Sequence, residues 1–388
     1  MKNKNYTQTI YACYFGYITQ AIVNNLAPLL FLTFQKTFDL SLEKITLITT
    51  VNFCVQLLTD LASVKLVDKI GYRASAFISH LLSCIGLVAM ALLPNFLGYT
   101  GLMIAVVLYA IGGGLIEVII SPIVEACPTE KKEAAMSLLH SFYCWGHVGV
   151  VLLSTAFFYF IGIEHWQILI CLWAIVPFAN MLNFLRVPLY PIVSEQEKIS
   201  VHDIFKEKII WIFLLLMICA GAAEQAISQW SSAFAESALK VSKTVGDLAG
   251  PCGFALMMGI ARALYGKFST KISLKFAMIS SAALCIACYL VAALSKNQFA
   301  ALAGCSLTGF SVGLFWPGTF SLAASKLKRG GTAVFALLAL AGDLGCSSGP
   351  TLVGFIASHY DGDFTKGILY ALVFPITILI TMITCEAQ

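Results

Sequence analysis

The sequence predicts an all-α integral membrane protein whose twelve transmembrane helices form two pseudo-symmetric six-helix bundles. Three observations support this fold class. Of the 388 residues, 59% are hydrophobic and only 11% are charged, with a mean hydropathy of +0.86, whereas soluble domains carry about 25% charged residues. Apolar runs of about 20 residues, the length that crosses a bilayer, recur twelve times along the chain. Short motifs of the first half also recur in the second half.

The twelve apolar runs are joined by short connections, with one exception. Residues 187–208, "VPLYPIVSEQEKISVHDIFKEK", are polar, charged and interrupted by proline. This segment divides the chain into a first bundle, residues 1–186, a cytoplasmic linker, residues 187–208, and a second bundle, residues 209–388. The expected helices are 8–35, 44–66, 75–94, 98–123, 134–161, 165–186, 209–236, 243–264, 275–295, 298–323, 331–358 and 365–384.

The distribution of Lys and Arg predicts the orientation, because cytoplasmic loops of membrane proteins are enriched in both. With the N-terminus inside, the cytoplasmic segments hold 17 of the 24 Lys and Arg residues and the opposite side holds six. We therefore expect a multi-pass protein of the cell membrane whose termini and linker are cytoplasmic. The net charge of +4 is spread over many loops and does not indicate nucleic-acid binding.

Three motifs of the first half recur in order in the second half. The offsets are 205, 195 and 196 residues, which is nearly constant. Two repeated six-helix halves are typical of secondary transporters, whose site lies near the midplane between the halves. The matched positions are Gln20 and Gln225, Pro122 and Pro317, Gly146 and Gly342, and Gly149 and Gly345.

The seventh apolar run carries Glu224, Gln225 and Gln229 at its centre, although ionisable groups inside a span cost about 2.5–3.5 kcal/mol. Gln225 and Gln229 are four residues apart and share a helix face, and Trp230 follows. Carboxylate and amide groups bind hydroxyls, and an indole ring packs on the C–H face of a sugar. The stretch therefore predicts half of a site for a polyhydroxylated solute. The alternative is a buried polar contact between helices.

The first, fifth and tenth helices supply further candidates for this site. On the fifth helix, "HSFYCWGH" places two histidines and a tyrosine on one face, and a packing role for either histidine stays open. The predicted substrate-binding residues are Gln20, Asn24, Asn25, His140, Tyr143, Glu224, Gln225, Gln229, Trp230 and Trp316.

Glu117 lies about two turns from the cytoplasmic end of the fourth helix, in "GGGLIEVIISPIVEA". Gly113 and Gly114 let another helix approach closely, and Ser121 shares the face of Glu117. A carboxyl in this low-dielectric position favours its neutral form, so we expect it to exchange a proton during function. The alternative is a permanently protonated or paired structural residue.

Four other ionisable residues within the expected helices suggest internal ion pairs. Arg262 and Asp343 are opposite charges in the second half, and Asp60 and His147 hold near-equivalent positions in the first. Alternatively, Asn52, Gln56 and Asp60 form a polar stripe that faces the pathway. The chain contains no motif for ATP hydrolysis, catalysis, haem or flavin, so we expect neither an enzyme nor a metal or cofactor other than H+ as the coupling ion.

The loop after the second helix, "LVDKIGYRAS", resembles the signature loop of the major facilitator superfamily, through Asp68, Lys69, Gly71 and Arg73. Val64 stands where the family has glycine, and Tyr72 where it has a basic residue. "RALYGKFSTKIS" looks like the copy in the second half. The resemblance implies the major facilitator fold, and we expect Asp68 and Arg73 to act in ion pairs or gating.

A narrower resemblance is to the fucose–proton symporters of that superfamily. It rests on Gly112, Gly114, Glu117 and Pro122 in the fourth helix, on "AAMSLLHSFYCWG" in the fifth and on "GAAEQAISQW" in the seventh. The resemblance implies transport of a sugar with protons, and it implies that Glu117 is the proton-coupling group. The family's fucose carrier has an Asp shortly after Asn-Asn-Leu in helix 1, whereas here Asn24-Asn25-Leu26 is followed by Ala27-Pro28. Glu224 is therefore the second candidate for proton coupling.

We expect a secondary active transporter that moves a sugar or similar small polar solute by alternating access, as a monomer in the lipid bilayer. One alternative is a proton-driven exporter of amphipathic compounds. Such exporters often carry a Gly-Pro motif in helix 5, whereas Gly349-Pro350 here lies in the eleventh helix. The other is a transporter-like sensor or lipid-handling protein.

Overall fold

The computed structural model describes residues 6–129, 132–190, 204–268, 272–326 and 331–384. Every regular element in these ranges is a helix, and twelve stretches of the described chain are long and apolar enough to cross a membrane. Their ends differ from the predicted ranges by at most five residues, so the predicted fold class is confirmed. Residues 191–203 of the predicted linker lie outside the described ranges.

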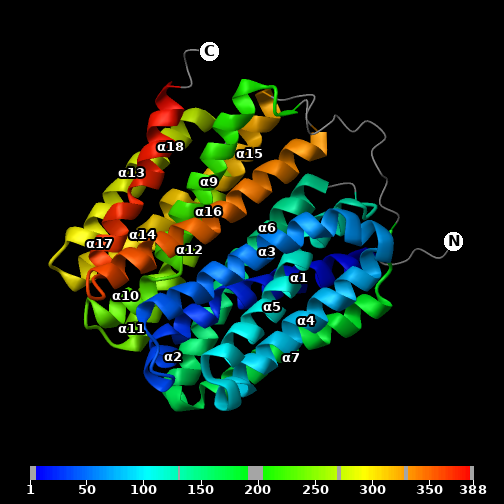
Figure 1. Ribbon diagram of the computed structural model, residues 1–388. Helices are drawn as coiled ribbons and strands as arrows, with labels where there is room; N and C mark the ends of the chain where they lie inside the picture. The colour runs from blue at the N-terminus through cyan, green and yellow to red at the C-terminus, as the bar shows by residue number, and fades with distance from the viewer. Residues whose placement is uncertain (1–5, 130–131, 191–203, 269–271, 327–330, 385–388) are drawn as a thin grey trace. The chain divides into compact units, whose positions relative to one another are not determined.

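The chain forms two compact units, one of residues 1–40 and 51–194 and one of residues 41–50 and 195–388 (Figure 1). The first half of the chain forms α1 (Tyr6–Asn25), η1 (Ala27–Leu30), α2 (Phe31–Thr37), α3 (Leu42–Ile70), α4 (Tyr72–Leu92), α5 (Pro94–Glu125), α6 (Lys132–Phe160), η2 (Ile163–His165) and α7 (Trp166–Arg186). The second half forms α9 (Lys208–Ser228), α10 (Ser231–Ser237), α11 (Lys243–Asp247), the π-helical η3 (Leu248–Cys252), α12 (Gly253–Phe268), α13 (Leu274–Leu294), α14 (Gln298–Val312), α15 (Phe315–Lys326), α16 (Gly331–His359), α17 (Phe364–Ala371) and α18 (Val373–Thr384).

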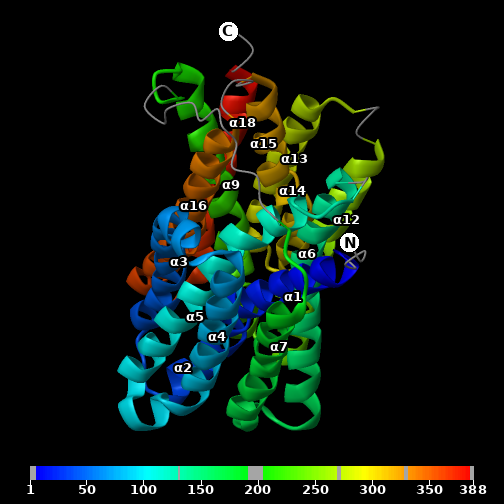
Figure 2. The ribbon, with the colours of Figure 1, turned by 90° about the vertical axis from the view of Figure 1, so that its right-hand side faces the viewer.

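Equivalent helices pack against each other in the two units. In the first unit, α1 packs against α5, α6 and α7, and α4 packs against α5 and α7 (Figure 2). In the second unit, α9 packs against α14, α16 and α18, and α13 packs against α14 and α18. These are the same pairs by order along each half. The repeated motifs of the sequence therefore correspond to a repeated helix arrangement.

Prolines accompany breaks in the first and the tenth span, because proline lacks the N–H that an unbroken helix requires. Pro28 removes the donor that would bond to the carbonyl of Asn24, and α1 ends at Asn25 before η1 and α2 complete the span. Pro317 likewise removes the donor for the carbonyl of Gly313, which lies between α14 and α15. The polar side chains of the site lie at or near such breaks.

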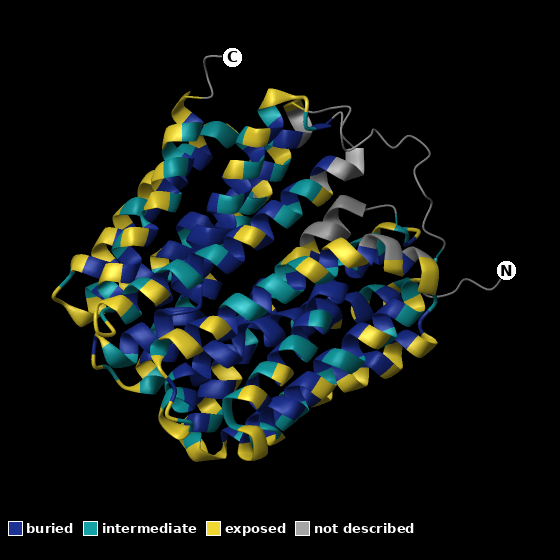
Figure 3. Ribbon diagram, viewed as in Figure 1, coloured by how far each residue is buried: buried dark blue, intermediate teal, exposed yellow. Residues whose placement is uncertain are grey.

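Buried residues lie on the helix faces that meet inside each unit, and exposed residues lie mainly on the outer faces (Figure 3). Many exposed side chains are large and apolar, including Phe96 and Phe160, which are 82% and 80% exposed. Such a surface is unfavourable in water and is expected of helices that contact lipid. The burial pattern thus agrees with the twelve spans.

The signature loop forms a turn of one residue between α3 and α4. Gly71 has φ +83°, a conformation that glycine adopts without the penalty that a Cβ would bring. Arg73 then donates from its guanidinium to the carbonyl oxygens of Phe184 and Val187 at the end of α7, the second at 2.8 Å. A cation at a helix C-terminus is favourable, so Arg73 fastens α4 to α7. The side chain of Asp68 is outside the described structure, as is part of "RALYGKFSTKIS".

We expect Arg73→Ala to lower the stability of the protein by about 2–3 kcal/mol, because two carbonyl oxygens lose a charged hydrogen-bond donor. Arg186→Ala is the matched control, since Arg186 ends the same helix α7 and is exposed. Thermal melting of both purified variants measures the effect. Equal melting temperatures for the two variants would contradict a fastening role for Arg73.

Glycines allow α9 and α16 to pack backbone against backbone. A Cβ at Gly345 would overlap the carbonyl oxygen of Ile218, and one at Gly349 would overlap that of Ala222. Gly221 of α9 faces the carbonyl of Gly342 in the same way. In the first unit, by contrast, a Cβ at Gly149 would meet no atom within 4 Å. Gly345 and Gly149 are equivalent in the sequence repeat, yet only Gly345 is required for packing.

Gly345→Ala is therefore expected to destabilise the second unit by about 1–3 kcal/mol or more, because the backbone of α9 cannot rotate away as a side chain could. Gly149→Ala is the control at the equivalent position and should behave as wild type. The measurement is the yield and melting temperature of monodisperse protein in detergent. A loss of yield that is the same for both variants would show that glycine is needed for reasons other than this contact.

Candidate functional site

A network of side-chain amides joins α1 to α3 in the first unit. The Oδ1 atom of Asn24 accepts hydrogen bonds from Asn52 at 3.2 Å and from Gln56 at 2.8 Å. Gln56 Nε2 also donates to Asn52 Oδ1 at 3.0 Å, and Gln56 Oε1 accepts from Gln20 at 2.9 Å. All four side chains are buried. The polar stripe of α3 therefore contacts α1 within the unit.

Glu117 of α5 is the acidic end of this amide network. Gln20 Nε2 donates to Glu117 Oε2 at 3.1 Å, so Gln20 uses its amide group on both Gln56 and the carboxyl. One turn further along α5, the hydroxyl of Ser121 lies 3.2 Å from that of Tyr17 on α1. The carboxyl is partly buried. A change in the protonation of Glu117 would alter the hydrogen bond from Gln20 and, through Gln20, the hydrogen bonds of the amide network.

The helix α6 brings its predicted residues to α1 in different environments. Tyr143 Oη lies 3.4 Å from Asn25 Nδ2, which also donates to the carbonyl of Ala21. The ring of His140 is exposed and lies 5.3 Å from that of Tyr17, between centroids. His147 is buried on the same helix. Tyr143 and Asn25 are thus positioned together, whereas the described contacts place His140 beside Tyr17.

In the second unit, Glu224, Gln225 and Gln229 form a ladder along α9. Gln229 Nε2 donates to Gln225 Oε1 at 3.0 Å, and Gln225 Nε2 donates to Glu224 Oε1 at 3.4 Å. Glu224 Oε2 lies 4.0 Å from Arg262 Nη2 of α12. The ladder ends where α9 ends, at Ser228 and the following turn. The predicted polar centre of the seventh span is therefore one connected group with a cation at one end.

Arg262 also reaches the break between α14 and α15. Its Nε donates to the carbonyl oxygen of Gly313 at 3.2 Å, the oxygen that Pro317 leaves without a helical donor. Arg262 forms an ion pair with Glu224, and the pair between Arg262 and Asp343 that the sequence suggested stays a prediction. Arg262 therefore connects the carboxylate of the seventh span to the broken tenth span.

Trp230 packs inside the second unit, and the contact of its ring with a solute stays a prediction. It is 1% exposed, its indole N–H donates to the carbonyl oxygen of Pro350 at 2.8 Å, and its ring lies 5.1 Å from that of Phe364 between centroids. A Cβ at Gly354 would lie 2.6 Å from the same ring. The sequence showed Trp230 near the polar residues, but the turn after Ser228 directs the indole into α16 and α17.

Trp316 lies on α15 and Asp343 lies on α16, and the two helices are in contact. The ring of Trp316 covers Gly342, where an added Cβ would overlap it, and its centroid is 6.2 Å from that of Phe320. Trp316 is half-buried, whereas Asp343, the next residue after Gly342, is 6% exposed. Trp316 remains a candidate for solute contact because the residue is only partly buried.

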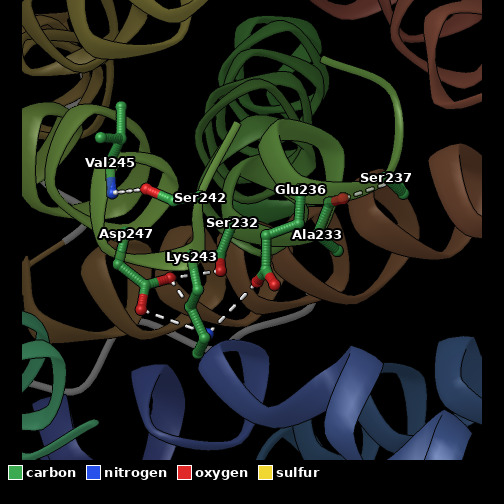
Figure 4. A network of polar contacts seen from close by, with 8 residues as sticks. All are labelled: Ser232, Ala233, Glu236, Ser237, Ser242, Lys243, Val245 and Asp247. Carbon is green, nitrogen blue, oxygen red and sulfur yellow. Dashed lines mark hydrogen bonds and ion pairs between the residues drawn. The ribbon is translucent and has the colours of Figure 1, made fainter. Parts of the chain in front are cut away.

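The sequence prediction missed a polar network between α10 and α11 (Figure 4). Lys243 Nζ lies 3.2 Å from Asp247 Oδ2 and 3.3 Å from Glu236 Oε1, and Ser232 donates to Asp247 Oδ1. Asp247 is completely buried. The spacing of Lys243 and Asp247, four residues apart, is a signal for such a pair on a helix. The network holds together the two short helices at the end of the seventh span and the start of the eighth.

The fold and these buried polar groups define the class of the protein. Two repeated units of six spans, with amides and carboxyls where helices break, are the construction of a secondary transporter, because irregular backbone at membrane depth serves to line a site or cavity. The model of the Major Facilitator Superfamily matches residues 13–383. The chain belongs to this superfamily of membrane transporters, as the signature loop indicated.

Solved structures of transporters share this fold. A bacterial homologue of the human lysosomal transporter Spinster, in an inward-facing and occupied conformation, aligns with a TM-score of 0.81 over 100% of this chain and 98% of that chain. A D-xylose–proton symporter aligns with a TM-score of 0.78 over 98% of this chain and 96% of that chain. The Escherichia coli fucose–proton symporter aligns with a TM-score of 0.66 over 99% of this chain and 100% of that chain. Each is 14% identical in sequence. Comparison with curated protein sequences finds no match.

Proposed function

We propose that this transporter moves a sugar or a similar small polar solute together with protons, in the cell membrane with both termini in the cytoplasm and as a monomer. Buried amides and carboxyls in both units supply the donors and acceptors that a polyhydroxylated solute requires. The likeness in fold to symporters of D-xylose and of fucose agrees with this substrate class. H+ is the coupling ion, and no other cofactor is part of the proposal.

The observation that carries the proposal is the contact between Glu117 and Gln20. A carboxyl within a membrane span is expensive and is usually functional, and this one is held by an amide that belongs to a larger amide network. Proton uptake on Glu117 weakens the carboxyl as an acceptor of the hydrogen bond from Gln20. Gln20 also bonds to Gln56, and Gln56 bonds to Asn24, so the change can reach Asn24. A solute bound by the amides would thereby sense the protonation state of Glu117.

The proposal is tested with purified protein in proteoliposomes. We expect uptake of at least one radiolabelled pentose or hexose, faster with an inward proton gradient than without one, and proton movement that accompanies the solute. Nucleosides and amphipathic drugs are the comparison substrates. Proton-driven transport of drugs alone would favour an exporter, and no transport of any soluble compound would favour a sensor or lipid-handling protein.

A further inference from the structure

Two carboxyl groups lie side by side in the first unit. A carboxylate oxygen of Asp60 on α3 lies within 4.8 Å of one of Glu117 on α5. Gly114 permits this approach, because a Cβ at that position would lie 2.9 Å from Asp60 Oδ1 and 2.9 Å from the carbonyl oxygen of Gln56. Asp60 is 7% exposed. The sequence had associated Asp60 with His147 or with a polar stripe, and the structure places it beside the candidate proton-coupling residue.

Within the first unit, α1 and α5 contribute no basic side chain to the surroundings of the pair. The sequences of α1 and α5 contain no Lys, Arg or His. On α3 the nearest base is Lys65, five residues after Asp60, and its side chain is outside the described structure. Two carboxylates so close together in a low-dielectric interior do not both ionise readily, so such pairs hold one proton between them.

Within the first unit, the remaining titratable groups described near the pair come from α1 and α6. Tyr17 of α1 has its hydroxyl near Ser121. His140 and His147 are the titratable side chains of α6 in this part of the unit, the first beside the ring of Tyr17 and the second buried. From α4, the residue that approaches α5 at Gly112 is the uncharged Ser83.

The side chain of Gln20 points independently to a bound proton. It is 2% exposed, and its Nε2 donates to Glu117 and Gln56. Its Oε1 is buried and accepts no hydrogen bond from the described residues. This oxygen lies 2.9 Å from the Cβ position of Gly113, the residue before the glycine that Asp60 faces. An unsatisfied acceptor on the amide that bonds to Glu117 is suited to a carboxylic O–H donor.

We propose that Asp60 and Glu117 form a two-carboxyl site that holds one shared proton, with Gln20 as its positioning residue. The proton bonds to one carboxylate and is donated to the other, and its release to water leaves both ionised. The first helix of this chain has no acid after Asn24-Asn25-Leu26. In this proposal Asp60 of α3 supplies the second carboxyl group instead. The part of this site in transport rests on the proposed function, whereas the shared proton can be tested without transport.

Infrared difference spectroscopy of the purified protein in lipid nanodiscs tests the shared proton directly. At pH 7 we expect a carboxylic acid C=O band in wild type that is lost in the double variant Asp60→Asn with Glu117→Gln. In each single variant the band should change frequency or vanish, because the partner of the proton has changed. Asp361→Asn is the control, since Asp361 is exposed, and it should leave the band unaltered. If Asp60→Asn is not recovered folded, Asp60→Ser removes the same carboxyl.

A band that is identical in wild type and Asp60→Asn would overturn the shared site, as would the absence of any difference between wild type and the double variant. In proteoliposomes, Asp60→Asn should lose proton-driven accumulation to the same extent as Glu117→Gln, with no further loss in the double variant. Failure of wild type to transport sugars would defeat the proposed function and leave the infrared result standing. The two failures are therefore distinguishable.

Discussion

Replacing Glu117 with glutamine is expected to abolish proton-driven accumulation of the solute and to leave solute exchange intact. A pH gradient of one unit stores about 1.4 kcal/mol per proton, which supports about a tenfold solute gradient at one proton per solute. The amide cannot titrate near neutral pH, so the accumulation ratio should fall to about one. Glutamine keeps the shape of the side chain and part of its hydrogen bonding with Gln20, so the protein should fold.

The measurement is accumulation and counterflow of the labelled solute in proteoliposomes with a defined pH gradient. Glu125→Gln is the matched control, because Glu125 ends the same helix α5 and is exposed. It should accumulate solute as wild type does. Unchanged accumulation by the Glu117 variant would remove this residue from the coupling mechanism.

The second large effect is expected for Glu224, whose replacement by glutamine should weaken solute binding by about ten- to a hundredfold. Hydrogen bonds to a charged group contribute about 1.5–3 kcal/mol, and each 1.4 kcal/mol is a factor of ten in affinity. The same change leaves Arg262 without the carboxylate 4.0 Å away. Loss of the carboxylate partner of a partly buried cation is destabilising, so the ligand-free melting temperature should also fall.

A second substitution separates recognition from stability. Arg262→Gln in the Glu224→Gln background removes the cation that paired with Glu224 and keeps an amide donor for the carbonyl of Gly313. We expect this double variant to regain the melting temperature of wild type while its binding stays weak. The measurement is the ligand-induced thermal shift of each variant over a range of pH, with the solute found in the uptake experiment.

The opposite outcome has a clear meaning. If Glu224 serves only as the ion partner of Arg262, the double variant should be stable and should also bind the solute as wild type does. Gln225→Leu gives an independent check, because Gln225 is 4% exposed and its described partners are Glu224 and Gln229. It should weaken binding by about two- to tenfold if its amide contacts solute.

The sequence alone determined the twelve spans, the repeat and the family, because each depends on local properties. A span requires about 20 apolar residues, and hydropathy along the chain records this directly. The breaks at Pro28 and Pro317 were not predicted: both prolines lie within expected helices, and Pro122, Pro177 and Pro350 stand inside continuous helices, so the absence of an N–H does not by itself mark a break. The positions of Gln20, Glu117, Glu224 and Gln225 inside spans also identified them as candidates, because polar groups are costly there.

Only the tertiary structure decided which of these groups meet. The partner described for Arg262 is Glu224, Asp60 lies beside Glu117, and the ring of Trp230 packs into α16 and α17. Gly149 and Gly345 are equivalent in the repeat, yet only the second touches another backbone. The physical reason is that helix periodicity fixes the face on which a residue lies, whereas the neighbour of that face depends on the rotation and close approach of helices far apart in the chain.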